Sequence, residues 1–341
     1  MPIIQSISRF VQALQIPFSV ASNLNHQKIF IRKNIQPLLE KAQKIADGSL
    51  DEADRKKITG YYGLAVPAIL GEAFCALRGD PMTDKERMAS TCQGAMTGLG
   101  DDFFDKQRLS EQGVKDFIEK PHMFNGNTAS EKLFLDFYKT ALANTPQPSK
   151  MQEQIYKVFY AQLLSKQQDQ PGLSYEIIKD ITILKGAESL LYYRTAFEHL
   201  LKKGEEKMLY SLGGLMQLSN DIFDVYKDHT NSVHTLVTTA TTIKKLRFHY
   251  SALLQIGIET AFRSGYPKKN VRKFMGIISI GIFSRCYVCL DQLEKIEKRS
   301  GHVFDLKVYS RKDLVCDMDT VANKLRSLRY HVRIGKWMKG I

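Results

Sequence analysis

Apolar residues recur every three or four positions along most of the chain, whereas strict alternation of apolar and polar residues is almost absent. A spacing of three to four places apolar side chains on one face of an α-helix. The pattern therefore predicts an all-α fold, a single large helical bundle. Residues 1–341 are interpreted as one domain, in which residues 1–60 supply N-terminal helices.

Two prolines set the expected boundaries of the first helices. A first helical pattern covers residues 3–14, and Pro17 is expected to end it. A second pattern runs over residues 25–46, where Pro37 is expected to kink or restart the helix.

Further along the chain, polar runs and glycines divide the helical patterns. Residues 110–128 are expected to be mostly loop, because they include Pro121 and Gly126. Thr83 and Glu86 have the spacing of a capping box for a helix that ends near residue 105. Two more helices are predicted over residues 174–203 and 211–228.

A compact acidic cluster, Asp101-Asp102-Phe103-Phe104-Asp105, lies near the end of the helix predicted after Thr83. On a helix, Asp101 and Asp105 share one face and Asp102 lies beside them. Carboxylates this close repel one another, and a divalent cation with oxygen ligands would relieve the repulsion. A solvated acidic patch is the alternative for this motif taken alone.

A second polar stripe follows on the helix predicted over residues 211–228. Asn220, Asp224 and Asp228 are spaced i, i+4 and i+8, and the residues between them are largely apolar. Two rows of oxygen donors on otherwise apolar helices predict opposing walls of a metal-lined pocket, with a metal site formed by Asp101, Asp102, Asp105, Asn220, Asp224 and Asp228.

The charge balance is strongly basic. The chain holds 49 Lys and Arg against 36 Asp and Glu, a formal net charge of +13. This excess favours anionic partners: a phosphorylated substrate, nucleic acid or an acidic membrane surface. Because no RNA-binding pattern of interleaved aromatic residues is present, nucleic acid is not expected as a partner, whereas peripheral contact with a membrane stays open.

The five cysteines are an odd number without a convincing secretory signal, so a reducing cytoplasmic setting is expected. Cys286 and Cys289 form the one CxxC pair and are interpreted as core thiols. No stretch of uncharged apolar residues reaches the length of a transmembrane helix.

The first acidic cluster resembles the DDxxD motif of the class I isoprenoid synthases, and residues 217–228 resemble their second metal motif. The resemblance is sharp over these two segments and loose over residues 60–335. It implies an isoprenoid synthase-like all-α bundle around a central apolar cavity, in which Mg²⁺, as a group of three ions, binds the diphosphate of a prenyl substrate. It also implies that the metal assists cleavage of the allylic C–O bond, after which an apolar pocket protects the carbocation.

The same resemblance implies a set of basic residues for the diphosphate. Lys185, beside Gly186, matches the basic residue on the family's broken helix, and Arg194 is a second candidate on the same helix. Arg329 and Tyr330 resemble the Arg-Tyr pair that closes over the diphosphate in many terpene cyclases. Aromatic residues suited to the pocket wall or to ordinary core packing are Phe103, Phe104, Tyr192, Tyr193 and Phe223.

The second motif and the segments outside the two motifs indicate the branch of the family. The second motif is similar to that of terpene cyclases, of chain-elongating prenyl synthases with Asn220 in place of the first aspartate, and of squalene and phytoene synthases. Residues 30–90 lack the Gly-Gly-Lys-x-Arg type segment of chain elongation, and residues 230–236 contain no arginine. One diphosphate site favours a terpene cyclase, a lyase that releases diphosphate.

Three alternatives stay open at this point. The first is a prenyltransferase, either chain-elongating or of the squalene and phytoene synthase kind. The second is a basic helical protein that binds membranes or nucleic acid without catalysis. The third is a synthase-like chain that has kept its fold and lost its chemistry, because Asp224 and Asp228 replace the usual hydroxyl residue and glutamate of the cyclase motif.

Overall fold

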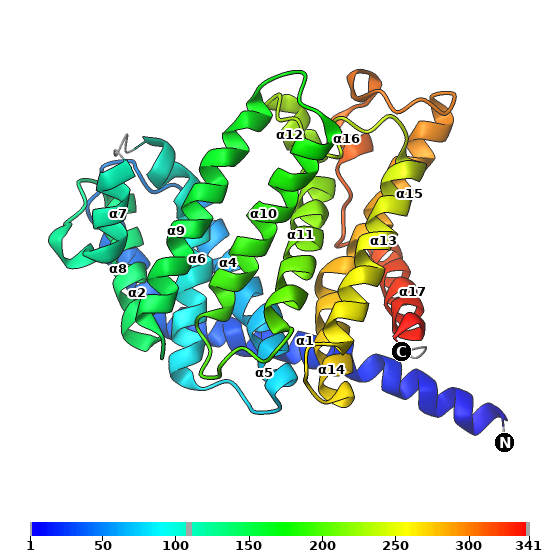
Figure 1. Cartoon of the computed structure of the whole chain (residues 1–341), viewed down its shortest axis with the longest axis horizontal. Helices are drawn as coiled ribbons and strands as arrows, with labels where there is room; N and C mark the ends of the chain where they lie inside the picture. The colour runs from blue at the N-terminus through cyan, green and yellow to red at the C-terminus, as the bar shows by residue number, and fades with distance from the viewer. Residues whose placement is uncertain (1, 107–110, 339–341) are drawn as a thin grey trace. The chain divides into compact units, whose positions relative to one another are not determined.

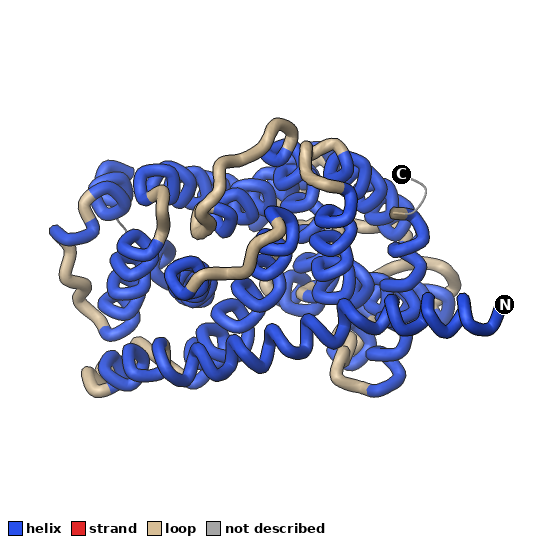
Figure 2. Tube along the Cα trace, turned by 90° about the horizontal axis from the view of Figure 1, so that it is seen from below, coloured by secondary structure: helices blue, strands red, loops and turns tan. Residues whose placement is uncertain are grey.

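The computed structural model describes the backbone of residues 2–106 and 111–338, and the side chains of residues 15–100 and 112–338. Figure 2 shows helices joined by loops, with no strand in the described part of the chain. The predicted all-α fold class is therefore confirmed. The chain divides into two compact units, one formed by Met1–Tyr156 with Tyr192–Leu200 and the other by Lys157–Leu191 with Leu201–Ile341. The expectation of a single domain stays a prediction, as does the central apolar cavity.

The first unit consists of the segments coloured blue to blue-green in Figure 1, together with the green segment Tyr192–Leu200. In chain order its helical elements are α1 (Pro2–Asn34), α2 (Gln36–Gln43), α3 (Glu52–Lys56), η1 (Lys57–Tyr61), α4 (Tyr62–Ala65), η2 (Val66–Gly71), α5 (Glu72–Arg78), α6 (Asp84–Lys106), α7 (Glu111–Glu119), η3 (Pro121–Met123), α8 (Ala129–Asn144) and the first half of α9 (Pro148–Ser165).

The second unit contains the end of α9, most of α10 and all later elements. These are η4 (Lys166–Asp169), α10 (Tyr175–Arg194), α11 (Glu205–Phe223), α12 (Val225–Thr230), α13 (Ile243–Phe262), α14 (Lys268–Ile278), η5 (Ser279–Phe283), α15 (Ser284–Arg299), η6 (Leu306–Val308), α16 (Arg311–Leu314) and α17 (Val321–Trp337). Helix α11 packs on α13 and α15, and α17 packs on α15.

Local sequence signals explain several helix ends. The Thr83–Glu86 capping box forms as predicted: the Glu86 N–H donates to Thr83 Oγ1 at 3.2 Å, and the Thr83 N–H donates to Glu86 Oε2 at 2.9 Å. Pro37 lies in the first turn of α2, so the chain restarts a helix there. Gly79 closes α5 with a φ of 100°, a left-handed conformation that favours glycine.

Two expected boundaries are wrong. Pro17 lies inside α1 and does not end it, because a proline removes one helix hydrogen bond and a long helix can tolerate that loss. Residues 110–128 are not mostly loop, since α7 fills Glu111–Glu119. Its Val114, Phe117 and Ile118 are buried, and this packing stabilises a helix too short to form alone.

Two later helices have bounds that differ from the prediction. Helix α10 ends at Arg194, and the helix over residues 211–228 is divided at Asp224, whose φ of −93° and ψ of 9° leave the helical range. Aspartate is a poor residue for a helix interior, which is consistent with a break at this position.

Two helical stretches, Glu52–Arg78 and Lys268–Arg299, are long and apolar enough to cross a membrane by length and composition. Of their most apolar windows, 61% and 72% are buried inside the protein. This degree of burial is also found in core helices.

Candidate functional site

The second acidic motif forms a compact cluster at the end of α11 and the start of α12. The break at Asp224 does not separate its members: the Asp224 N–H donates to the Asn220 carbonyl at 2.8 Å, and the Asp228 N–H donates to the Asp224 carbonyl at 2.9 Å. Asn220, Asp224 and Asp228 therefore keep the helical spacing that the sequence predicted. Their side chains are all half-buried.

Asp221 lies deeper than its neighbours, with only 4% of its surface exposed. Gln217 Nε2 donates to its Oδ1 at 2.9 Å, and the Thr182 hydroxyl of α10 donates to its Oδ2 at 3.5 Å. Asn220 Nδ2 donates to Asp224 Oδ2 at 3.4 Å. The amides of Gln217 and Asn220 thus orient two carboxylates of the cluster.

Burial and mutual repulsion make the charged forms of these carboxylates costly. Burial raises the pKa of Asp221 to about 6. Burial first, and then repulsion by Asp221 and Asp224, raises the pKa of Asp228 to about 7. Burial also raises the pKa of Asp224 above its usual value. A cluster with this much uncompensated negative charge is a good environment for a cation.

Lys185 of α10 supplies positive charge to this cluster. Its ammonium group lowers the pKa of Asp221, of Asp224 and of Asp228, in each case as a smaller effect than burial. The structure therefore brings together the predicted Lys185 and the predicted residues of the second motif, all within the second unit.

The adjacent Gly186 has a packing role. A Cβ atom at Gly186 would lie 2.1 Å from the carbonyl oxygen of Gly213 on α11, and one at Gly213 would lie 2.4 Å from the Gly186 carbonyl oxygen. The two glycines let the backbones of α10 and α11 approach closely, which carries Lys185 to the acidic cluster. Helix α10 continues through Gly186, in agreement with the helix predicted over residues 174–203.

The donor chemistry of the cluster fits a hard divalent cation. Mg²⁺ is usually bound by one or two carboxylates and completes its coordination with water and substrate phosphate oxygens. Among the side chains that the structure describes, no group of three or more His, Cys, Asp or Glu residues is arranged to hold a metal ion by itself. The cluster would therefore hold Mg²⁺ through one or two of its carboxylates, together with a phosphorylated ligand.

The first acidic motif belongs to the first unit. The backbone of Asp101, Asp102 and Asp105 is helical, at the end of α6 as predicted, but their side chains lie outside the described residues. Their metal-binding role, and the opposition of the two motifs across one pocket, stay predictions.

Tyr192 and Tyr193 contact α6 shortly before that motif. The Tyr193 hydroxyl hydrogen-bonds the Thr97 hydroxyl at 2.8 Å, and the Tyr192 hydroxyl donates to Met96 Sδ at 3.7 Å. Gln93 Nε2 donates to the Tyr192 carbonyl at 2.7 Å. These contacts hold the end of α10 against α6 within the first unit.

Arg194 lies in a buried position at the end of α10, with 3% of its surface exposed. Its guanidinium donates to the His199 carbonyl at 2.9 Å and to the Phe197 carbonyl at 3.5 Å, and it lies 6.0 Å from the centre of the Phe74 ring. Arg194 thus stabilises the turn after α10, and its predicted role in diphosphate binding stays a prediction.

Arg329 and Tyr330 of α17 belong to a third group of side chains. Arg329 is exposed, while the Tyr330 hydroxyl donates to Asp291 Oδ1 at 2.7 Å and the Tyr330 ring stacks on Tyr287 at 4.9 Å. Arg247 binds the same Asp291 carboxylate at 2.7 Å.

A row of aromatic rings leads from this third group to the acidic cluster. Tyr287 packs edge-on against Tyr250 at 5.2 Å, and the Tyr250 hydroxyl hydrogen-bonds Ser219, the residue before Asn220, at 3.0 Å. Sequence reasoning missed Tyr250 and Tyr287, together with Thr182. Their types and spacing are those of ordinary core residues, so the sequence carried no signal that could distinguish them from the rest of the core.

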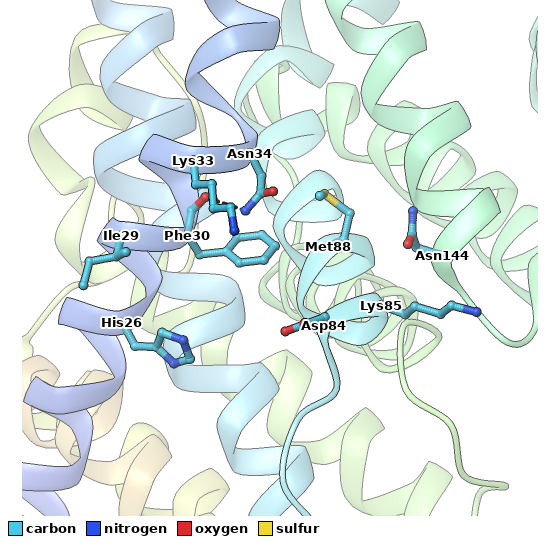
Figure 3. A pocket seen from close by; sticks show the side chains of 9 residues that line it. All are labelled: His26, Ile29, Phe30, Lys33, Asn34, Asp84, Lys85, Met88 and Asn144. Atoms are coloured by element: carbon cyan, nitrogen blue, oxygen red, sulfur yellow. Dashed lines mark hydrogen bonds between the residues drawn. The ribbon is translucent and has the colours of Figure 1, made fainter.

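A cavity of about 420 Å³ lies in the first unit, apart from all predicted site residues. Figure 3 shows His26, Phe30 and Lys33 of α1 on one side of it and Asp84 and Lys85, at the start of α6, on the other. Asn34 Nδ2 donates to the Phe30 carbonyl at 3.0 Å along this edge. The cavity is lined by both charged and apolar groups.

No family model matches the chain, and no curated protein matches it. Among solved structures, the chain is similar to a dehydrosqualene synthase whose crystal structure was determined in complex with a ligand. The sequences are 12% identical, the TM-score is 0.44, and the alignment covers 96% of this chain and 100% of the other. At this TM-score the similarity carries no argument about activity.

Proposed function

We propose that the protein is a class I terpene synthase that ionises a prenyl diphosphate with the help of Mg²⁺ and cyclises the resulting carbocation. The observation that carries this proposal is the cluster of Asn220, Asp221, Asp224 and Asp228, half-buried to buried, with Lys185 beside it on α10. The DDxxD sequence at Asp101–Asp105 supports it, because both motifs occur in the order found in that superfamily.

The chain's own residues would act on the diphosphate group. Lys185 would bind a phosphate oxygen and compensate the negative charge that remains when the carboxylates hold Mg²⁺. When bound, Mg²⁺ would neutralise the charge that develops on the leaving diphosphate. Asn220 would supply a neutral oxygen ligand, and its amide nitrogen already donates to Asp224. The C–O bond breaks with its electron pair on the diphosphate, which leaves an allylic cation.

The fate of that cation defines the product. Ring closure followed by loss of a proton gives a cyclic hydrocarbon, and capture of water gives an alcohol. The buried Leu218 and Ile222 lie next to residues of the motif, and such apolar neighbours would limit the access of water to the cation.

A prenyltransferase is the second candidate. The sequence Gln217-Leu218-x-Asn220-x-x-x-Asp224-x-x-x-Asp228 is similar to the pattern of squalene and phytoene synthases, and the Gln217 amide donates to Asp221 within the cluster. In this reading the cation is attacked by a second isoprenoid substrate instead of by its own chain.

A screen of single prenyl diphosphates of increasing chain length, each with Mg²⁺, tests the proposal. Diphosphate release is measured, and products are identified by mass spectrometry. A cyclic hydrocarbon or alcohol from one substrate alone supports the terpene synthase. A product that requires isopentenyl diphosphate, or that joins two prenyl units, identifies a prenyltransferase. If folded protein releases no diphosphate from any substrate, both proposals are wrong.

A further inference from the structure

Helix α17 exposes an apolar stripe that none of the described side chains covers. Val321, Leu325 and Val332 are 74%, 55% and 38% exposed, and Leu328 between them is half-buried. Their spacing of i, i+4, i+7 and i+11 places them on one side of the helix, along roughly 16 Å of its length. An exposed apolar stripe of this kind marks an interaction surface more often than isolated apolar residues do.

The opposite side of α17 is already occupied. Ser327, His331 and Ile334 are buried, the Ser327 hydroxyl hydrogen-bonds the Ser284 hydroxyl at 2.8 Å, and His331 Nδ1 lies 3.2 Å from the Ser279 hydroxyl. These contacts fix the rotation of α17 against α15 and η5. The apolar stripe is therefore a second face of a helix that is already packed into its unit.

Basic residues border the apolar stripe. Arg326, Arg329, Arg333 and Lys336 are exposed and follow the spacing i, i+3, i+7 and i+10, so they form a row beside it. The Arg333 guanidinium lies 6.0 Å from the centre of the Trp337 ring. The helix contains no Asp or Glu. Two acidic residues outside the helix bind its described side chains: Asp319 lies 3.5 Å from Lys324, and Asp291 accepts a hydrogen bond from Tyr330 on a different side of the helix from the basic row.

We propose that this face of α17 binds a membrane surface that contains anionic lipids. Val321, Leu325 and Val332 enter the boundary between headgroups and acyl chains, and Arg326, Arg333 and Lys336 contact lipid phosphates. A helix with an apolar face, a basic face and a nearby tryptophan is suited to lie in the plane of such an interface. Each basic residue near an anionic surface adds to the attraction.

Other occupants fit this face less well. Two copies of α17 would bring two rows of positive charge together, which opposes a dimer through this face. A nucleic acid backbone would be attracted by the basic row but would leave the apolar stripe exposed. A lipid surface satisfies both stripes at once. This inference does not depend on the proposed catalytic activity.

Vesicle flotation tests the proposal with the full chain. Wild-type protein is mixed with vesicles of phosphatidylcholine alone or of phosphatidylcholine with phosphatidylglycerol. We expect binding only to the second kind. The variants L325S/V332S and R326Q/R333Q should each bind these vesicles at least about tenfold more weakly than the wild type. Arg329 is left unchanged, because it is a candidate for diphosphate binding.

Matched controls lie on α13, which also exposes apolar and basic residues. Phe248 is 77% exposed, and Lys244 and Lys245 are exposed. F248S and K244Q/K245Q should bind anionic vesicles like the wild type. If K244Q/K245Q weakens binding as much as R326Q/R333Q, net charge and not α17 is responsible, and the proposal is wrong.

Three further results would also overturn the proposal. The first is equal binding of the wild type to both kinds of vesicle, and the second is binding of a labelled RNA that depends on α17 while vesicle binding does not. The third is a wild-type dimer, detected by light scattering, that the L325S/V332S substitutions dissociate, when the wild type binds neither kind of vesicle. If L325S/V332S has a lower melting temperature than the wild type, R326Q/R333Q decides the result, because it removes charge and leaves Val321, Leu325 and Val332 in place.

Discussion

Lys185 and the carboxylates of α11 and α12 are the residues from which a function can be argued. Asp221 and Asp228 have pKa values raised to about 6 and about 7, chiefly by burial, and Lys185 opposes that rise. A protein that only needed a stable helix pair would gain by replacing these residues with apolar ones. Their cost to stability is consistent with a role in binding.

Alanine substitutions at the two acidic motifs test that role. Asp101→Ala and Asn220→Ala should each lower turnover of a prenyl diphosphate by orders of magnitude, because each removes a side-chain oxygen that we propose as a ligand of Mg²⁺. Far-UV circular dichroism should remain unchanged. Asn231→Ala, at an exposed position just after α12, is the matched control and should keep its activity. Near-normal turnover in both motif variants would contradict the metal-site proposal.

We expect His331 to make the free energy of unfolding depend on pH. Burial lowers the pKa of this histidine to about 4, below the usual value of about 6.5 in an unfolded chain. Between these values the unfolded state binds more protons, so His331 lowers the free energy of unfolding as the pH falls through 6.5, by at most about 1.4 kcal/mol per pH unit.

Urea unfolding at pH 7 and pH 5 measures this effect. Because other groups also titrate in this range, the quantity to compare is the difference in unfolding free energy between the wild type and His331→Gln. That difference should shrink as the pH is lowered. Parallel pH profiles for the two proteins would show that His331 does not protonate on unfolding.

At the level of elements, the pair α10 and α11 positions the site. Gly186 and Gly213 allow the two backbones to touch, and Gly214 lies against Ile183 of α10. Close contact at this point brings Thr182 to Asp221 and Lys185 to the acidic cluster. The geometry of the cluster therefore depends on residues without side chains as much as on charged ones.

Gly186→Ala should destabilise the protein by about 3 kcal/mol, because its Cβ would lie 2.1 Å from a backbone oxygen that cannot move away easily. Gly335→Ala is the matched control, since a Cβ at that helical position meets nothing within 4 Å. It should stabilise α17 by about 0.5–1 kcal/mol. Urea midpoints measure both changes, and an unaltered midpoint for Gly186→Ala would disprove the close contact.

At the level of the whole molecule, ligand linkage gives a test that does not require turnover. A ligand that binds only the folded state raises the melting temperature, and at a concentration of 100 Kd it adds about 2.7 kcal/mol of stability. MgCl₂ together with inorganic diphosphate should therefore raise the melting temperature, and EDTA should abolish the increase. Lys185→Ala should reduce it.

Magnesium sulfate at equal ionic strength is the control for nonspecific effects of ions. Because the proposed site needs a phosphate ligand as well as the cation, magnesium sulfate should give a smaller shift than magnesium with diphosphate. Equal shifts with the two anions would contradict a diphosphate site.

Local signals in the sequence predicted the helices well where the side chains act on their own backbone. The capping box at Thr83 and Glu86 and the restart at Pro37 follow from such local chemistry. Predictions failed where packing outweighed local preference: α1 continues through Pro17, and α7 forms because three apolar side chains are buried.

By itself, the sequence determined the helical class and the spacing of the donors at Asn220, Asp224 and Asp228, because both depend on residues a few positions apart. Only the tertiary structure decided that Lys185 lies near enough to these carboxylates to lower their pKa values, that Arg194 binds backbone carbonyls, and that one side of α17 is left exposed by the described residues. Such features depend on contacts between residues distant in the chain, on which helical periodicity carries no information.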